Sequence, residues 1–303
     1  MKMRMKEKWI AIGWTAIYMA IAFALVFTVS FGLGFVVVFA GLQTGIVQFD
    51  AMQNYDSFLQ SFLTYIQQGT PLMVLNFAEE LIMFACFGLW YYFREKKYHY
   101  RPDYVRAFSA KNVCSMAGIA FFGQYAVNLL LILIYILLPG IFAQYEELIQ
   151  TLDIDAGNPV LMIFCVVIFG PLVEEILFRG MIFGRLRRAF SFWPSALISA
   201  VLFGVFHMNF VQGIYAGVFG LSLAYIFEKT ETLWGCYMLH AFFNLSSYII
   251  SGYESALEGA GIPLLTSIQL IISVISVAVV AVLIKNFGKR ADKRLEKSYN
   301  SPV

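Results

Sequence analysis

The sequence predicts an all-α polytopic membrane protein: a bundle of about eight transmembrane helices with both termini in the cytoplasm. Composition is the first reason, since 60% of the 303 residues are hydrophobic and only 13% are charged. A soluble domain has about 45–50% apolar and about 25% charged residues, because a charged surface must cover its core. Two further observations are the long apolar segments and the distribution of basic residues between them. Together they exclude a pair of soluble domains.

Eight segments approach the ~20 apolar residues that a transmembrane helix needs. They cover residues 10–39, 72–93, 113–138, 160–178, 195–208, 210–227, 233–250 and 263–284. The first is long enough to tilt or kink, whereas the fifth and sixth are short and directly joined. Fusion of these two segments into one span is therefore the main alternative to eight spans.

The positions of the charges test the number of spans, because cytoplasmic segments collect Lys and Arg. With an inside N-terminus and eight spans, the inside segments hold all 21 basic residues: Lys2, Arg4, Lys6, Lys8, Arg94, Lys96, Lys97, Arg101, Arg106, Lys111, Arg179, Arg185, Arg187, Arg188, Lys229, Lys285, Lys289, Arg290, Lys293, Arg294 and Lys297. The charged residues of the outside segments are all acidic: Asp50, Asp56, Glu146, Glu147, Asp153, Asp155, Glu254 and Glu258. Loss of one span would move the last basic cluster outside, so the pattern favours an even number.

Other features narrow the class of protein. The apolar stretch after the basic start is about 30 residues long and lacks a small-residue cleavage site, which indicates a retained anchor rather than a signal peptide. The four cysteines lie singly in apolar spans, which is typical of small buried side chains. A net charge of +2 gives no reason to expect a nucleic-acid partner. We expect three regions: 1–158 without a recognised motif, a catalytic core at 159–251, and a last span with a basic tail at 252–303.

Ionisable residues at membrane depth are functional candidates by default, because burying a charge there costs ~3 kcal/mol or more. They are Glu79, Glu80, Glu174, Glu175, His207 and His240. Glu175 and Arg179 are four residues apart in the favourable order for an ion pair on a helix. Glu174 is rotated by ~100° from that pair and is left available as a general base. The alternative is a pair of snorkelling acids at a cytoplasmic helix end.

Two further spacings concern the histidines. His240 and Asn244 lie on one helix face, so that both can donate to one developing oxyanion; a polar helix contact is the alternative. His207 follows Phe203 by one turn, which places an apolar wall beside a residue that could equally be a packing histidine. Helical rise puts Glu174, His207 and His240 at similar depths, so we expect one cavity open to the cytoplasm. By the same estimate Glu79 and Glu80 lie nearer the outer face, as snorkelling or helix-contact residues, and an accessory role at the site is the alternative.

Three motifs then resemble a known family. The segments Glu174-Glu175-Ile-Leu-Phe-Arg179, Phe203-Gly-Val-Phe-His207 and His240-Ala-Phe-Phe-Asn244 look like the EExxxR, FxxxH and HxxxN motifs of the CPBP intramembrane proteases. That family includes Rce1-type CAAX prenyl endopeptidases and bacterial proteins labelled Abi. The resemblance implies that Glu174 and His207 activate water, that His240 and Asn244 stabilise the oxyanion, and that Glu175, Arg179 and Phe203 give structural support.

Cofactor, partner and function remain open at this level. Glu174, His207 and His240 form the ligand set of many catalytic zinc sites, but the HExxH spacing is absent, and we favour a metal-free mechanism. The expected partners are the lipid bilayer and a membrane-associated protein or peptide, prenylated as in eukaryotic relatives or not, in a prokaryotic plasma membrane. The leading function is an intramembrane endopeptidase. A non-catalytic partner, such as a bacteriocin immunity factor or scaffold, is the alternative. A proton-coupled transporter that uses the paired glutamates is the third hypothesis, and the lack of repeated halves and of broken helices in matching positions argues against it.

Overall fold

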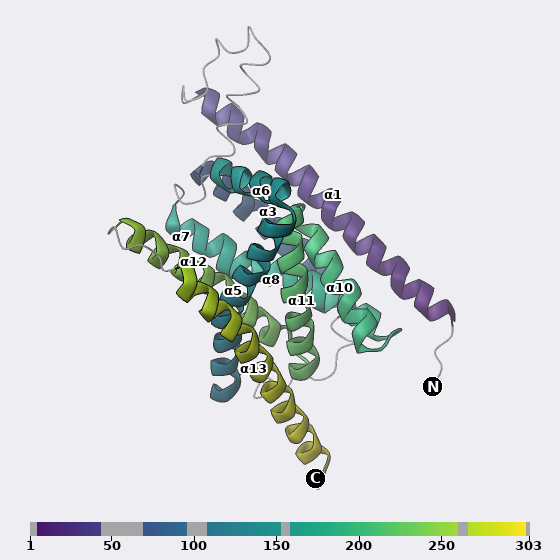
Figure 1. The fold of residues 1–303 in the computed structure, drawn as a ribbon. Helices are drawn as coiled ribbons and strands as arrows, with labels where there is room; N and C mark the ends of the chain where they lie inside the picture. The colour runs from purple at the N-terminus through teal and green to yellow at the C-terminus, as the bar shows by residue number, and fades with distance from the viewer. Residues whose placement is uncertain (1–4, 44–68, 96–107, 153–157, 260–265, 301–303) are drawn as a thin grey trace.

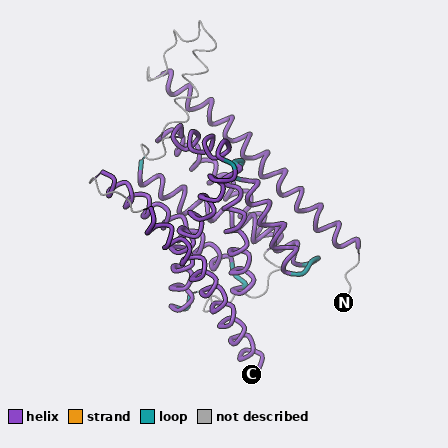
Figure 2. The backbone as a smooth tube through the Cα atoms, viewed as in Figure 1, coloured by secondary structure: helices purple, strands orange, loops and turns teal. Residues whose placement is uncertain are grey.

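The computed structural model describes residues 5–43, 69–95, 108–152, 158–259 and 266–300. Within these ranges the chain forms helices joined by short turns, and no strand is present (Figures 1 and 2). The long elements are α1 (Met5–Gln43), α3 (Gly69–Trp90) with η2 (Tyr91–Glu95), α5 (Ala110–Leu137), α6 (Pro139–Leu152), α10 (Phe192–Phe206), α11 (Phe210–Thr230), α12 (Leu233–Gly259) and α13 (Thr266–Asn300). Between α6 and α10 runs a composite helix: α7 (Pro159–Met162), η5 (Ile163–Phe169), α8 (Gly170–Glu175), η6 (Ile176–Phe183) and α9 (Gly184–Arg187).

The all-α membrane class is confirmed, and each predicted span coincides with a helix. Six helices of the described part are long and apolar enough to cross a membrane; α10 is apolar but shorter. α12 is continuous over 27 residues although it carries several polar groups, and it is not among the six. The loops that hold Asp50, Asp56, Asp153 and Asp155, and the basic residues Lys2, Arg4, Lys96, Lys97, Arg101 and Arg106, lie outside the described residues.

The composite helix forms the centre of the bundle. Of its most apolar window, 44% is buried, against 12% for α1 and 11% for α13, whose exposed faces are apolar and suited to lipid. Leu177, Phe178, Ile182 and Phe183 are completely buried on η6. The bundle therefore places Glu174 and Glu175 on one of its two most enclosed helices, with α3, α10, α11 and α12 packed around the composite helix.

The composite helix alternates between α-helical and π-helical turns. Pro171 lacks a backbone N–H, so it cannot donate the hydrogen bond that a regular α-helix needs at that position. The π-helical segments η5 and η6, of seven and eight residues, lie on either side of α8, and π-helical geometry occurs frequently at functional sites. The two glutamates therefore lie between two segments of π-helical backbone.

A close hairpin joins α10 and α11. Asn209 begins α11 by accepting a hydrogen bond from the Gln212 amide at 2.9 Å, and Met208 adopts a left-handed conformation with φ of 52°. A side chain on Gly204 would collide with the carbonyl oxygen of Gly213, so the two helices cross with backbones in contact. This crossing fixes His207, the C-cap residue that follows α10, at the tip of the hairpin.

The N-terminal end of α1 and the C-terminal end of α13 lie at the same end of the bundle, while α6 runs across the opposite end (Figure 1). The composite helix ends with α9, which carries Arg185 and Arg187 and lies at the end of the bundle that is remote from α6. We use the terms basic end and α6 end for these two ends below.

Candidate active site

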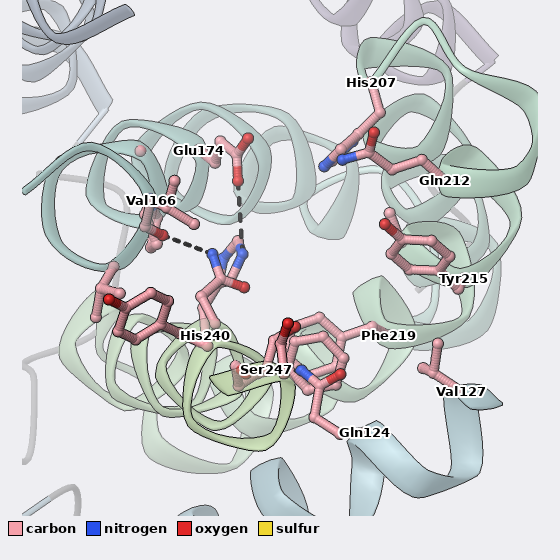
Figure 3. Close-up of a pocket in the computed structure, with 18 of the residues that line it drawn as sticks. Gln124, Val127, Val166, Glu174, His207, Gln212, Tyr215, Phe219, His240 and Ser247 are labelled. Carbon is pink, nitrogen blue, oxygen red and sulfur yellow. Dashed lines mark hydrogen bonds and ion pairs between the residues drawn. The ribbon is translucent and has the colours of Figure 1, made fainter. Parts of the chain in front are cut away.

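A cavity of about 890 Å³ lies between α3, α5, α6, the composite helix, α10, α11 and α12. It is lined by the four residues predicted to be catalytic and by Phe203: Glu174, Phe203, His207, His240 and Asn244. Figure 3 shows Glu174, His207 and His240 around this space, each from a different helix. Residues that are up to 70 positions apart in the sequence are therefore assembled in one pocket.

The two neighbouring glutamates have different environments, as their helical rotation predicts. Glu175 is 1% exposed, and its Oε1 accepts a hydrogen bond from Arg179 Nη1 at 2.9 Å. Glu174 lines the cavity with its side chain 22% exposed. One carboxylate is thus neutralised by an ion pair, and the other faces the space where a ligand can bind.

Arg179 does not lie at a helix end, which corrects its expected position at the start of a cytoplasmic segment. The helix continues to Arg187, and the Arg179 side chain is completely buried. Its Nη2 donates to the Gly220 carbonyl oxygen at 3.1 Å, and its guanidinium lies 4.5 Å from the centroid of the Phe203 ring. These contacts and Glu175 compensate a charge that would be very costly alone, so a buried position is tolerated.

His240 lies between the two glutamates. Its Nδ1 is 2.8 Å from Glu175 Oε1 and its Nε2 is 3.6 Å from Glu174 Oε2. A carboxylate only accepts hydrogen bonds, so Nδ1 carries the proton and Nε2 is directed toward Glu174. Arg179, Glu175, His240 and Glu174 consequently form a continuous polar chain, in which Glu175 orients the imidazole as the acid of a catalytic triad does.

His207 is oriented by the backbone of its own helix. Its Nδ1 lies 2.8 Å from the Phe203 carbonyl oxygen, which can only accept, so this nitrogen donates and Nε2 is left as the acceptor of the neutral ring. The Phe203 ring meets the imidazole edge to face at 4.8 Å, which gives the apolar wall expected from the spacing. Phe203 also packs edge to face on His240 at 5.7 Å. One phenyl ring thus supports both histidines.

Asn244 differs from its expected role in one contact. It shares the cavity-facing side of α12 with His240, as the spacing predicts, but its Nδ2 donates to the Val166 carbonyl oxygen at 2.7 Å. Its second N–H and its carbonyl oxygen are not used in that bond. Because η5 contains Val166, the contact ties α12 to the π-helical turn that precedes Glu174.

The cavity includes groups that the sequence reasoning did not select. Glu80 on α3 lines it, although helical rise placed this residue too far from Glu174. Neutral polar side chains complete the lining: Gln124, Asn128, Tyr145, Gln150, Gln212, Tyr215, Ser247, Tyr248 and Ser251. Isolated glutamines and tyrosines on long apolar helices were the available signal, but their faces could not be assigned without knowing how the helices pack.

The direction of the cavity also differs from the expectation. Its lining on α12 runs from His240 to Ser251, and on α5 from Gln124 to Leu131, in both cases away from the basic end. Tyr145, Ile149 and Gln150 of α6 line its far part. The cavity therefore extends from the glutamates toward the α6 end, whereas the sequence suggested an opening on the cytoplasmic side.

The geometry gives no set of metal ligands. The described residues contain no group of three or more His, Cys, Asp or Glu side chains placed to hold a metal ion. In particular, Glu174, His207 and His240 do not form such a group. The zinc site that the three residues suggested is not supported, and no chemical step below involves a metal.

Comparisons with known proteins identify the region that holds the site. The family described as "Type II CAAX prenyl endopeptidase Rce1-like" matches residues 156–246. The chain is also 33% identical over 105 residues to a Bacillus subtilis (strain 168) protein named "Putative membrane peptidase YdiL". That alignment covers 35% of this chain and 43% of the relative, so the chain spans less than half the length of this curated relative. No solved structure matches the chain significantly.

Proposed function

We propose that this membrane protein is an intramembrane endopeptidase of the CPBP type, because residues 156–246 match the Rce1-like family and part of the chain is similar to a protein named as a putative membrane peptidase. It hydrolyses a peptide bond of a membrane-associated protein or peptide, in a prokaryotic plasma membrane. The observation that carries the proposal is the assembly of Glu174, His207, His240 and Asn244 around one cavity inside a bundle of apolar helices.

Glu174 is the general base of the proposed reaction. Its carboxylate faces the cavity, while the neighbouring carboxylate of Glu175 is held by Arg179 and His240. Glu174 takes a proton from a water molecule as the water oxygen attacks the substrate carbonyl carbon. The same proton is then delivered to the leaving amine as the C–N bond breaks, so that atoms and charge balance over the cycle.

The remaining groups orient the water and stabilise the intermediate. His207 holds its Nε2 free as an acceptor that orients the attacking water. The second N–H of Asn244 donates to the oxyanion, and so does His240 Nε2 when it carries a proton. Donors fixed before the reaction stabilise such an anion strongly, because no reorganisation is needed as charge develops.

Two substitutions test this proposal in cells. Glu174→Gln and His207→Ala are compared with the parent at matched expression, and new protein termini are identified by mass spectrometry. We expect cleavage to fall on the order of 10²–10⁴-fold in both variants. Glu79→Gln is the matched control, since Glu79 is a neighbouring membrane glutamate that accepts a hydrogen bond from Ser30 and does not line the cavity.

The same experiment separates the enzyme from a non-catalytic membrane partner. A partner protein of this fold would produce no termini that depend on Glu174, and its phenotype would survive both substitutions. Undiminished processing in Glu174→Gln and His207→Ala would rule out the proposed peptidase.

A further inference from the structure

The charged groups of the cavity have one sign. Among the described residues that line it, the carboxyl groups of Glu80 and Glu174 are accompanied by His207 and His240, and no Lys or Arg is present. Arg179 is close by but is occupied by Glu175 and by the Gly220 carbonyl oxygen behind the cavity wall. The cavity therefore offers no fixed cation to a negatively charged ligand.

Glu80 is the carboxyl group of this cavity that the proposed mechanism does not use. Its Oε2 is buried and has no hydrogen-bond partner, and no ion pair with a described Lys or Arg neutralises it. Glu79 differs, because Ser30 Oγ donates to its Oε2 at 2.5 Å. Two adjacent glutamates on α3 thus have distinct surroundings, and only Glu80 faces the cavity.

Contact with Gly170 locates Glu80 relative to the catalytic base. A Cβ atom on Gly170 would lie 3.0 Å from Glu80 Oε1, so the Glu80 carboxyl group of α3 lies directly against α8 at this glycine. Gly170 and Glu174 are four residues apart and share one helix face, at a separation of about 6 Å along the axis. An extended peptide advances about 3.3 Å per residue, so this separation corresponds to about two substrate residues.

An ionised carboxylate inside a membrane protein is costly unless a cation compensates it. Since the described part of the chain supplies no such cation to Glu80, a bound substrate can supply it. The neutral amides and hydroxyls of the surrounding lining can hydrogen-bond a peptide backbone without competing for that charge.

We propose that Glu80 is a specificity-determining residue whose carboxylate binds a cationic group of the substrate peptide, about two residues from the cleaved bond. The group is a Lys or Arg side chain or a free amino terminus. This inference rests on the proposed peptidase function and narrows its substrate class. A substrate that ends in a C-terminal CaaX sequence brings a carboxylate instead, and the described lining residues include no Lys or Arg to receive it.

The test uses purified full-length protein in detergent micelles and a mixture of synthetic 14-residue peptides of randomised sequence, half of them acetylated at the amino terminus. Products are identified by mass spectrometry for the parent, Glu80→Gln, Glu79→Gln and Glu174→Gln. The readout is the ratio of cleavage rates for peptides with Lys and with the isosteric, neutral norleucine at each position. A ratio within one variant does not depend on how much of that variant is folded.

For the parent we expect Lys or Arg to be favoured on the order of tenfold at about two residues from the cleaved bond, as for a hydrogen-bonded charge pair. Glu80→Gln abolishes the preference, and Glu79→Gln retains it. Loss of cleavage in the acetylated half alone identifies the amino terminus as the cation, whereas equal cleavage of both halves identifies the side chain.

Three outcomes overturn the inference. Cleavage by the parent with a preference neither for basic residues nor for a free amino terminus, or a preference that persists in Glu80→Gln, contradicts the role of Glu80 and leaves the peptidase function intact. Preferred cleavage next to a free C-terminal carboxylate contradicts the proposed charge selection. Equal product from the parent and from Glu174→Gln removes the peptidase function, and the inference falls with it.

Discussion

His240 Nδ1 and Arg179 Nη1 share one acceptor, Oε1 of Glu175, at distances of 2.8 and 2.9 Å. The relationship between His240 and Glu175 links helices that are 65 residues apart in the sequence. It means that the residue that neutralises the buried arginine also orients the imidazole beside Glu174. Stability and catalysis should therefore depend on the same carboxylate.

Glu175→Gln should lower both properties. The glutamine retains a single neutral acceptor, and Arg179 loses the anion that compensates its buried charge, so we expect a loss of about 3–5 kcal/mol of stability. Cleavage should be abolished because the imidazole of His240 is no longer held. Thermal unfolding in detergent and the mass-spectrometric cleavage assay measure the two effects.

A double variant separates the two roles of Glu175. In Glu175→Gln/Arg179→Met the buried cation is removed as well, so that no buried charge is left without a counter-ion. We expect the double variant to be more stable than Glu175→Gln and still inactive. If the double variant were less stable than the single one, the charge of Arg179 would not be the cause of the instability.

Phe203→Ala should disorganise the site without removing a polar group. The ring is 1% exposed and packs on Arg179, His207 and His240. Its truncation should cost about 3–5 kcal/mol through the cavity left behind. Phe31→Ala on α1 is the control, because that ring is 71% exposed; equal melting temperatures for the two variants would contradict the packing role.

Gly204→Ala should force α10 and α11 apart and displace His207. The added methyl group would collide with the Gly213 carbonyl oxygen, which is backbone and cannot rotate away. Overpacking of this kind costs about 1–3 kcal/mol, and a small displacement of His207 is enough to lower the cleavage rate. Gly32→Ala is the matched control, since no atom lies within 4 Å of its added Cβ. Full activity of Gly204→Ala would show that the crossing does not position His207.

Asn244→Ala should reduce cleavage more than binding. The variant loses the proposed oxyanion donor, an effect of about 10²–10³ in kcat for comparable donors. It also loses the bond to the Val166 carbonyl oxygen, at a cost of about 1 kcal/mol of stability. Ser247→Ala, one turn along the same helix and also lining the cavity, is the control and should change kcat only slightly. A rise in KM with unchanged kcat for Asn244→Ala would assign it to substrate binding instead.

The local patterns of the sequence predicted what depends on one helix at a time. Hydropathy and length predicted eight spans, each of which coincides with a helix of the described residues, and four-residue spacing predicted the Glu175–Arg179 pair and the common face of His240 and Asn244. The helix end expected at Arg179 was wrong. A hydropathy pattern predicts a boundary at a charged residue even where a buried partner compensates the charge.

What the sequence determined by itself is the class of protein, the positions of its spans and the few ionisable groups that a membrane interior tolerates only for a reason. Only the tertiary structure decided which of these groups meet. The packing of α3 on α8 brings Glu80 to Gly170, the packing of α12 on the composite helix brings His240 to Glu175, and the cavity extends toward the α6 end. These are contacts between helices. The relative position of two packed helices depends on how their side chains interlock, and the periodicity of a single helix does not predict it.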